Sequence, residues 1–160
     1  MLRKTLIILC LVLGTAAAQN AAEYETNTSA GMTLAGVPLA IHGYDPVSFF
    51  TTAQPRIGKA KHTVAFNGAA YRFESEGNKQ KFEKDPARYA PQFGGYCAYG
   101  VALGAKFDGD PRLYKIVDGK LYFNLNPDIQ NKWLEDVNGN IDKADDNWTK
   151  IRTKSPTQKD

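Results

Sequence analysis

The sequence predicts a single α+β domain, in which a small antiparallel sheet of hairpins is packed against helices. Two observations indicate the hairpins. Apolar residues alternate on both sides of Asn67-Gly68 and again on both sides of Asp118-Gly119, dipeptides that favour two-residue hairpin turns. A third observation indicates the helices, because apolar residues recur at helical spacing in the last part of the chain.

Capping and turn residues predict the elements around the first hairpin. Ser75 is placed to cap a helix that ends at Asp85-Pro86, where one further helical turn begins. Gly94 and Gly95 predict a tight turn before a short helix in CAYGVALG. The earlier segment VPLAIHGYDPVSFF predicts a short strand, a turn and a second extended segment.

The last part of the chain predicts two helices. Asn126 is placed to cap the first, which carries Ile129, Trp133 and Val137 at four-residue spacing. Gly139 is expected to break this helix before a second amphipathic one. We find no internal repeat and no interdomain linker in the sequence.

The N-terminus has the pattern of a secretory signal. A basic start and a short apolar run lead to small residues at Ala16 and Ala18, which predicts cleavage after Ala18 and an exported chain, periplasmic or secreted. The expected organisation is a signal peptide at 1–18, a flexible lead-in at 19–36, a domain at 37–152 and a frayed tail at 153–160.

Charge limits the classes of partner. The full chain has 20 Lys and Arg against 17 Asp and Glu, and removal of the signal leaves 18 against 17. Because no basic patch is interleaved with aromatic residues, we expect no nucleic-acid partner. No later run is long and apolar enough to predict a membrane span in the mature chain.

Removal of the signal also removes Cys10 and leaves Cys97 as the single thiol, so no internal disulfide is expected. Three interpretations of Cys97 stay open. A free cysteine packs well as a small buried hydrophobe. The preceding glycines and a following helix start would favour a thiolate, which could bind a ligand or act as a nucleophile.

Three segments, in order, resemble the exported YHS domain proteins over roughly residues 37–150: GYDPVSFF, then FNGAAYRFESEGNKQKFEKDPARYAPQFGGYCAYG, then IVDGKLYFNLNPDIQNKW. The resemblance depends on a tyrosine-rich hairpin, a DPxxYAP segment and GGYCAY. It implies the fold more than a function, because many members of this family have no assigned activity.

Metal-handling members of the wider YHS group place cysteines after the second hairpin strand, in a pattern like YYFCSxxC. Aligning YRFESEGN on that pattern puts Glu74 and Asn78 at the two cysteine positions. The comparison therefore excludes a two-cysteine site and carries no copper or zinc role over to this chain.

Candidate ligands for a soft metal are few. His42, His62 and Cys97 lie far apart in the sequence, without CxxC, HxH or HExxH spacing. We expect His62 at a solvated strand end and His42 as the partner of Cys97 in any copper or zinc site. The dispersed acidic residues, including Asp108 and Asp110 in FDGDPR, do not form a calcium loop.

Two pairs of residues are predicted to line a ligand cleft, Tyr44 with Asp45 and Tyr96 with Tyr99, because both pairs lie on glycine-flanked turns. The leading hypothesis is an exported YHS-type binding module, not an enzyme, that binds a transition metal or small ligand in a tyrosine-lined pocket near Cys97. The alternatives are a thiol-dependent redox or acyl-transfer enzyme at Cys97, or a purely structural or interaction protein. The sequence leaves the ligand, the protein partner and the oligomeric state open.

Overall fold

The computed structural model describes residues 24–156 and contains two hairpins, each followed by helices. One hairpin pairs β1 (Lys59–Phe66) with β2 (Ala69–Phe73), and the other pairs β3 (Asp110–Val117) with β4 (Lys120–Asn124). The predicted α+β fold is confirmed. The hairpins do not join in one sheet, however, since each forms its own two-stranded antiparallel sheet.

The turns of both hairpins have the backbone that their sequences favour. Asn67 and Gly68 have φ of 47° and 76°, and Asp118 and Gly119 have φ of 49° and 73°. Positive φ at both central residues matches the right-handed twist of the strands, and Asn, Asp and Gly adopt it at low cost. The two predicted hairpin turns are therefore confirmed.

Short helices surround the hairpins. In chain order they are η1 (Ile41–Gly43), α2 (Ser48–Thr51), α3 (Glu76–Lys84), α4 (Pro86–Tyr89), η2 (Gln92–Gly95), α5 (Ala98–Ala102), α6 (Pro127–Leu134) and α7 (Val137–Ile151). The predicted caps Ser75, Asp85 and Asn126 are confirmed, because each side chain accepts the backbone N–H three residues later. Within residues 24–156, no helix has both the length and the apolar character needed to cross a bilayer.

In VPLAIHGYDPVSFF the expected short strand is present only as bridges, of Leu39 with Ala70 and of Pro38 with Met32, whereas the expected extended segment at residues 47–50 is wrong. The structure forms η1 and α2 there. The carboxylate of Asp45 accepts the N–H groups of Val47 and Ser48, at 2.9 and 3.3 Å, and so turns the chain into a helix. This local capture of backbone donors outweighs the β propensity of the apolar residues.

The expected helix break at Gly139 is also wrong. Helix α6 ends at Leu134, and α7 starts at Val137 and continues through Gly139. The side chain of Asp136 caps α7 by accepting the N–H of Gly139. A Cβ at Gly139 would collide with that carboxylate, so this glycine allows the cap to form instead of ending a helix.

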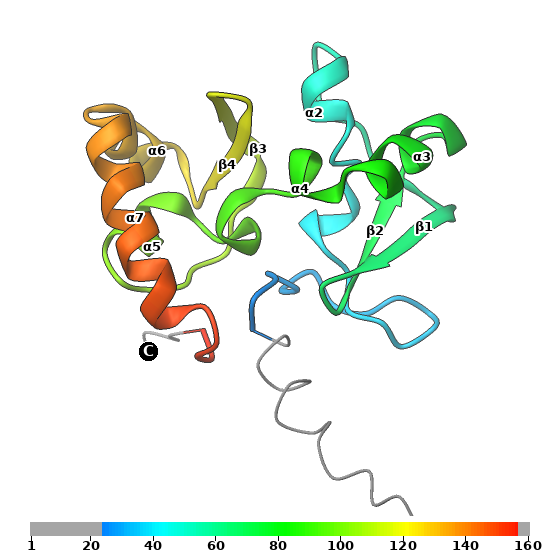
Figure 1. Ribbon diagram of the computed structural model, residues 1–160, viewed down its shortest axis with the longest axis horizontal. Helices are drawn as coiled ribbons and strands as arrows, with labels where there is room; N and C mark the ends of the chain where they lie inside the picture. Colours follow the sequence, from blue (N-terminus) through cyan, green and yellow to red (C-terminus); the bar gives the residue numbers. More distant parts are fainter. Residues whose placement is uncertain (1–23, 157–160) are drawn as a thin grey trace, which may run out of the picture.

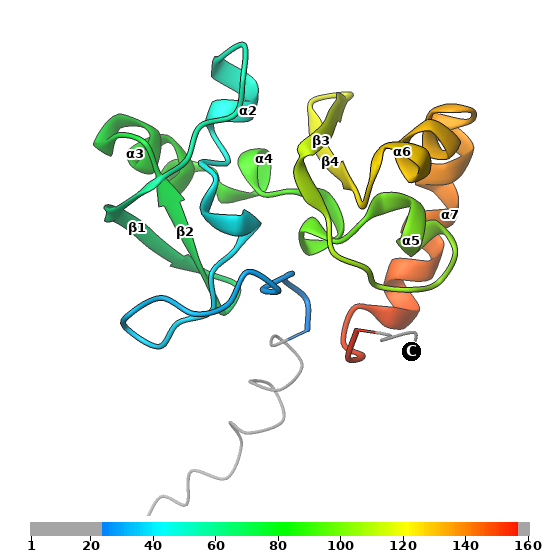
Figure 2. The same cartoon turned by 180° about the vertical axis from the view of Figure 1, so that it is seen from behind.

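The chain forms two lobes, which the views from front and back both separate (Figure 1, Figure 2). The first lobe contains η1, α2, β1, β2 and α3, and the second contains η2, α5, β3, β4, α6 and α7. Helix α4 lies between them in both views.

Strand β4 joins the two lobes through its side chains. Leu121 and Phe123 pack in the same apolar cluster as Phe49 and Phe73 of the first lobe, whereas Tyr122 packs with Trp133 of the second. Successive side chains of a strand point to opposite faces, so one strand supplies both cores. The ring centroids of Phe49 and Phe123 lie 5.4 Å apart across this junction.

Residues 24–29, the N-terminal strap, contact both lobes, because the N–H of Asn27 donates to the carbonyl of Gly94 at 2.8 Å and the hydroxyl of Thr26 donates to the carbonyl of Asn67 at 3.3 Å. Thr26 and Asn27 are buried, so packing begins before the domain start expected at residue 37. The predicted signal peptide lies outside the described residues. The ammonium of Lys106, also buried, donates to the carbonyls of Tyr24, Arg152 and Lys154 at 2.6 to 2.7 Å and thereby holds the strap beside the end of α7.

The carboxylate of Asp45 is a fully buried acceptor in the first lobe. Besides the two N–H groups of α2, it accepts the N–H of Glu74 at 2.9 Å and the side-chain amide of Asn78 at 2.7 Å. These bonds connect the start of α2 to the end of β2 and the first turn of α3. A buried carboxylate is tolerated only with such complete hydrogen bonding.

We expect Asp45→Ala to lower the free energy of unfolding by about 3 kcal/mol, because several buried N–H groups lose their acceptor at once. Urea unfolding followed by circular dichroism measures this loss. The matched control is Asp145→Ala, at an exposed position, which should change stability by less than about 0.5 kcal/mol. Equal effects of the two substitutions would contradict the role given to Asp45.

Candidate functional site

A polar pocket of about 350 Å³ lies where the two lobes meet, between η1 and the start of β3. Its lining residues are His42, Tyr44, Asp108, Asp110, Pro111, Arg112 and Leu125. A second pocket of about 350 Å³ adjoins it, because Tyr44 and Arg112 line both. We call the first the junction pocket.

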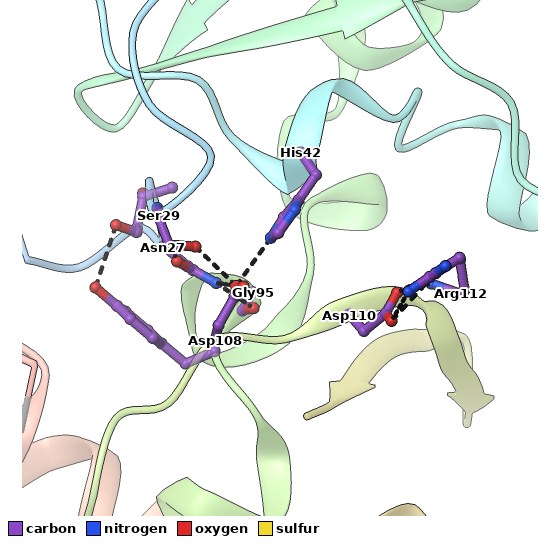
Figure 3. Close-up of polar contacts among 9 residues, drawn as sticks. Asn27, Ser29, His42, Gly95, Asp108, Asp110 and Arg112 are labelled. Carbon is purple, nitrogen blue, oxygen red and sulfur yellow. Dashed lines mark hydrogen bonds and ion pairs between the residues drawn. The ribbon is translucent and has the colours of Figure 1, made fainter. Parts of the chain in front are cut away.

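His42 is held in the pocket wall by an unusual backbone. Ile41 and His42 both have φ of 51°, and Gly43 follows with φ of 79°. The left-handed region is rare for residues other than glycine and disfavoured above all for a β-branched residue such as isoleucine, and each such residue costs about 1–3 kcal/mol. This backbone directs the imidazole of His42 toward Asp108 (Figure 3).

Asp108 is the centre of the polar contacts in Figure 3. Its Oδ1 accepts from Asn27 Nδ2 at 2.7 Å and from Ser29 Oγ at 2.8 Å, and lies 2.9 Å from His42 Nε2. Burial opposes ionisation of this carboxyl, but the hydrogen bonds from His42, Asn27 and Ser29 together outweigh burial and lower its pKa. Asp108 is therefore an anion at neutral pH.

The ionised Asp108 defines the chemistry available to His42. With Nε2 donating to the carboxylate, the Nδ1 atom of a neutral imidazole is left as an acceptor. Ser29 bonds to Asp108 and not to the imidazole, so the three residues do not form the relay that activates a serine hydroxyl. The group can bind and orient a ligand, and it contains no activated nucleophile.

Asp110 and Arg112 form an ion pair on the other side of the junction pocket. The guanidinium donates to both carboxylate oxygens at 2.6 to 3.1 Å, and these hydrogen bonds lower the pKa of Asp110. The side chain of Arg112 is 75% exposed, so the pair adds little to stability. The ion pair places a guanidinium in the pocket wall, but its charge is balanced by Asp110, so among the described residues Asp108 is the pocket carboxylate without a cationic arginine or lysine partner.

Cys97 lies inside the second lobe and is not among the residues that line the junction pocket. Cys97 is 1% exposed. Its sulfur accepts the N–H of Gly100 at 3.4 Å and lies 3.7 Å from Oδ1 of Asn124. Burial raises the pKa of the thiol, and the nearby backbone N–H groups offset this only in part. The thiol is therefore protonated at neutral pH.

The two predicted metal ligands, Cys97 and His42, do not form a preorganised metal site in the structure. In the part of the chain that the structure describes, no group of three or more His, Cys, Asp or Glu side chains is placed to hold a metal ion. His42 pairs with Asp108, and His62 pairs with Glu76 at 3.1 Å on the surface. Metal binding by Cys97 and His42 stays a prediction.

The predicted cleft residues are divided between the pocket and the interior. Tyr44 lines both adjoining pockets. Asp45 is buried beneath α2, and Tyr96 is 4% exposed, with its hydroxyl donating to the carbonyl of Thr26 at 3.4 Å. Tyr99 is half-buried, and its N–H donates to Asn124. Of these four, Tyr44 alone reaches the junction pocket.

Sequence reasoning did not identify the acidic and basic side of the pocket. Asp108, Asp110 and Arg112 all come from FDGDPR, which carried a charge signal but no ligand spacing. Their partners Asn27 and Ser29 lie in the expected flexible lead-in. Only the folded strap brings these distant residues to one carboxylate.

Comparison with known proteins identifies one part of the first lobe. Residues 56–93 match the family model of the YHS domain. No curated protein and no solved structure matches the chain. The YHS match supports a YHS domain-containing protein and spans both strands of the first hairpin, α3 and α4. None of the residues that line the junction pocket falls within the YHS match.

Substitution of Asp108 should change the acid sensitivity of the fold. Because its folded pKa is lowered below the unfolded value of about 3.9, the ionised carboxylate contributes stability above pH 4 that is lost as the pH falls through the folded pKa. We expect Asp108→Asn to be less stable by about 1 kcal/mol at pH 7, with a difference from wild type that shrinks below pH 4. Urea unfolding between pH 2 and 7 measures it. A constant difference across this range would contradict the assignment.

Cys97 should react slowly in the native protein. Burial and a raised thiol pKa both reduce the accessible thiolate, so iodoacetamide at pH 7 is expected to alkylate the folded chain far more slowly than the chain in guanidinium chloride. Mass spectrometry of timed samples follows the reaction. Similar rates in the two states would show that the thiol is exposed and reactive.

Proposed function

We propose that this protein is a non-catalytic binding module that takes a small organic amine into the junction pocket. The observation that supports it most strongly is the Asp108 carboxylate at the pocket wall, held ionised by three donors on one oxygen. Its second oxygen, Oδ2, has no partner among the described residues. That oxygen is the acceptor offered to a ligand.

The charge balance of the pocket favours a positively charged ligand. Asp108 and Asp110 supply two carboxylates, whereas Arg112 supplies one guanidinium, which Asp110 already binds. The two carboxylates therefore outnumber the one guanidinium, and the free oxygen of Asp108 is the unpaired acceptor among the described residues of the pocket. Tyr44 adds an aromatic ring to the pocket lining, and aromatic rings attract ammonium groups.

A metal ion is the second candidate, and one observation favours it. Histidines that bind metals usually donate their other ring N–H to a carboxylate, and His42 has this arrangement with Asp108. His42 would then bind a copper or zinc ion through Nδ1. Water would have to complete the coordination, because the described residues supply no three-ligand group.

Thiol chemistry is the candidate that the geometry supports least. The thiol of Cys97 is buried and protonated, and no imidazole is hydrogen-bonded to its sulfur among the described residues. A redox or acyl-transfer role would need an accessible thiolate. Export of the chain remains part of the proposal and depends on the signal pattern of residues 1–18, so N-terminal sequencing of secreted protein should begin at Gln19.

The test is a thermal-shift titration of the full mature chain with putrescine, glucose and citrate. We expect putrescine to raise the melting temperature in proportion to the logarithm of its concentration, and the neutral sugar and the anion to have no such effect. Asp108→Asn should abolish the shift by removing the ionised acceptor. Tyr44→Ala should weaken it.

Matched controls come from the surface pair of His62 and Glu76, which lies outside the pocket. Glu76→Gln should keep the full putrescine shift, and so should His62→Ala. Citrate binding without putrescine binding would contradict the proposal. Binding of Zn(II) or Cu(II) that His42→Ala abolishes, without any amine effect, would replace the amine by a metal ion.

A further inference from the structure

The two hairpins match each other residue by residue. In each, an eight-residue strand pairs with a five-residue strand across a two-residue turn. The pairing has the same irregularity in both, between Lys59 and Thr63 in the first and between Asp110 and Tyr114 in the second. Corresponding residues lie 51 positions apart in the chain, as from Lys59 to Asp110.

The helix caps after the hairpins keep the same separation. Ser75 caps α3 and Asn126 caps α6, both with extended backbone. Asp85 caps α4 with φ −151° and ψ 76°, and Asp136 caps α7 with φ −149° and ψ 76°. The four caps thus form two pairs with the same 51-residue separation, and one pair shares an uncommon backbone conformation. Two similar hairpins alone would not lead to this agreement.

The cores use equivalent aromatic residues. Phe82 in α3 and Trp133 in α6 are both fully buried and lie 51 positions apart. Each packs on the tyrosine at the third position of the second hairpin strand. The ring centroids are 5.1 Å apart for Tyr71 with Phe82 and 5.8 Å apart for Tyr122 with Trp133.

The segments before the hairpins also correspond, but here equivalent residues lie 52 positions apart, because the first unit has one extra residue before its hairpin. Three consecutive residues with positive φ begin at Ile41 and again at Phe93, where φ is 51° and 52°. Each triplet ends at a glycine, which is followed by a tyrosine and then by Asp45 or Cys97. Both of these side chains accept the N–H three residues later, at the start of α2 or α5.

We propose that residues 41–89 and 93–140 are two copies of one structural unit, and that the thiol of Cys97 holds the position of the carboxylate of Asp45. The equivalence extends to the strand end. Asp45 accepts the N–H of Glu74 just after β2, and the thiol of Cys97 lies 3.7 Å from Oδ1 of Asn124, the last residue of β4. Cys97 is thus a positioning residue that fixes α5 to the end of β4.

The duplication explains why, among residues 24–156, the second unit has no imidazole at the position that His42 holds in the first. Gly94 is the counterpart of His42, since each is the second residue of its positive-φ triplet. A side chain at Gly94 would collide with the carbonyl of Glu25, so the strap fills the place that the imidazole occupies in the first unit. We expect one ligand per chain, a consequence that rests on the proposed function.

The test compares Cys97→Ser with Cys97→Ala by urea unfolding. If Cys97 serves as an acceptor, serine keeps that function, and its unfolding midpoint should lie above that of alanine. If the sulfur only fills apolar space, the serine hydroxyl would be buried without a hydrogen-bond partner. The alanine variant should then be the more stable one. The matched control is Val101, also fully buried in α5, where alanine should be more stable than serine.

These stability measurements test the duplication and the role of Cys97 without depending on any bound ligand. A midpoint for Cys97→Ser at or below that of Cys97→Ala, or failure of the serine variant alone to fold, overturns it. A second measurement needs no variant. Scalar couplings of the wild-type backbone should place both Ile41 and Phe93 at positive φ, and a negative φ at either one would overturn the duplication even if neither variant folds.

Discussion

The fold depends on one repeated interaction, a buried side chain that accepts a backbone N–H where a short helix starts and that also contacts the end of a hairpin strand. In the first lobe, Asp45 accepts the N–H groups of Ser48 and Glu74. In the second, Cys97 accepts the N–H of Gly100, and its thiol lies 3.7 Å from Oδ1 of Asn124 at the end of β4. Helices as short as α2 and α5 are not stable by themselves, because helix nucleation is unfavourable. The side-chain acceptor supplies the missing stabilisation and fixes each helix to its hairpin. A carboxylate with four donors and a thiol with weaker ones meet the same geometric need.

The junction pocket is a consequence of how the two lobes are held together. Strand β4 contributes Leu121 and Phe123 to one core and Tyr122 to the other, so the lobes cannot separate without exposing apolar surface. The strap adds Asn27 and Ser29, which orient Asp108 toward His42. The stability of these contacts supports the left-handed backbone at His42, which would not persist in a flexible loop. The polar residues of the pocket are therefore supplied by segments distant in the sequence.

Local elements could be predicted from the sequence, whereas the arrangement between elements could not. The turns at Asn67 and Asp118 and the cap at Ser75 follow from residue preferences within a few positions, and these predictions are confirmed. The helix at α2 was missed because GYDP predicts a turn at Asp45, whereas Glu74 and Asn78 fix its carboxylate where it accepts the N–H groups that start the helix. The duplication was missed because equivalent positions share geometry and seldom share residues, as at Asp45 and Cys97. The pocket was missed because its acidic side depends on how the strap folds.

Amide hydrogen exchange tests the central claim, that buried acceptors hold each helix to its hairpin, most directly. The N–H of Glu74 lies just beyond β2 and that of Gly100 lies in the first turn of α5, two places where amides without an acceptor exchange quickly. The account predicts slow exchange at both positions in the wild type. Asp45→Asn should accelerate exchange about tenfold at Glu74, the effect of losing roughly 1.4 kcal/mol of protection, and leave Gly100 unchanged. Rapid exchange at both sites in the wild type, or no change at Glu74 in the variant, would contradict it.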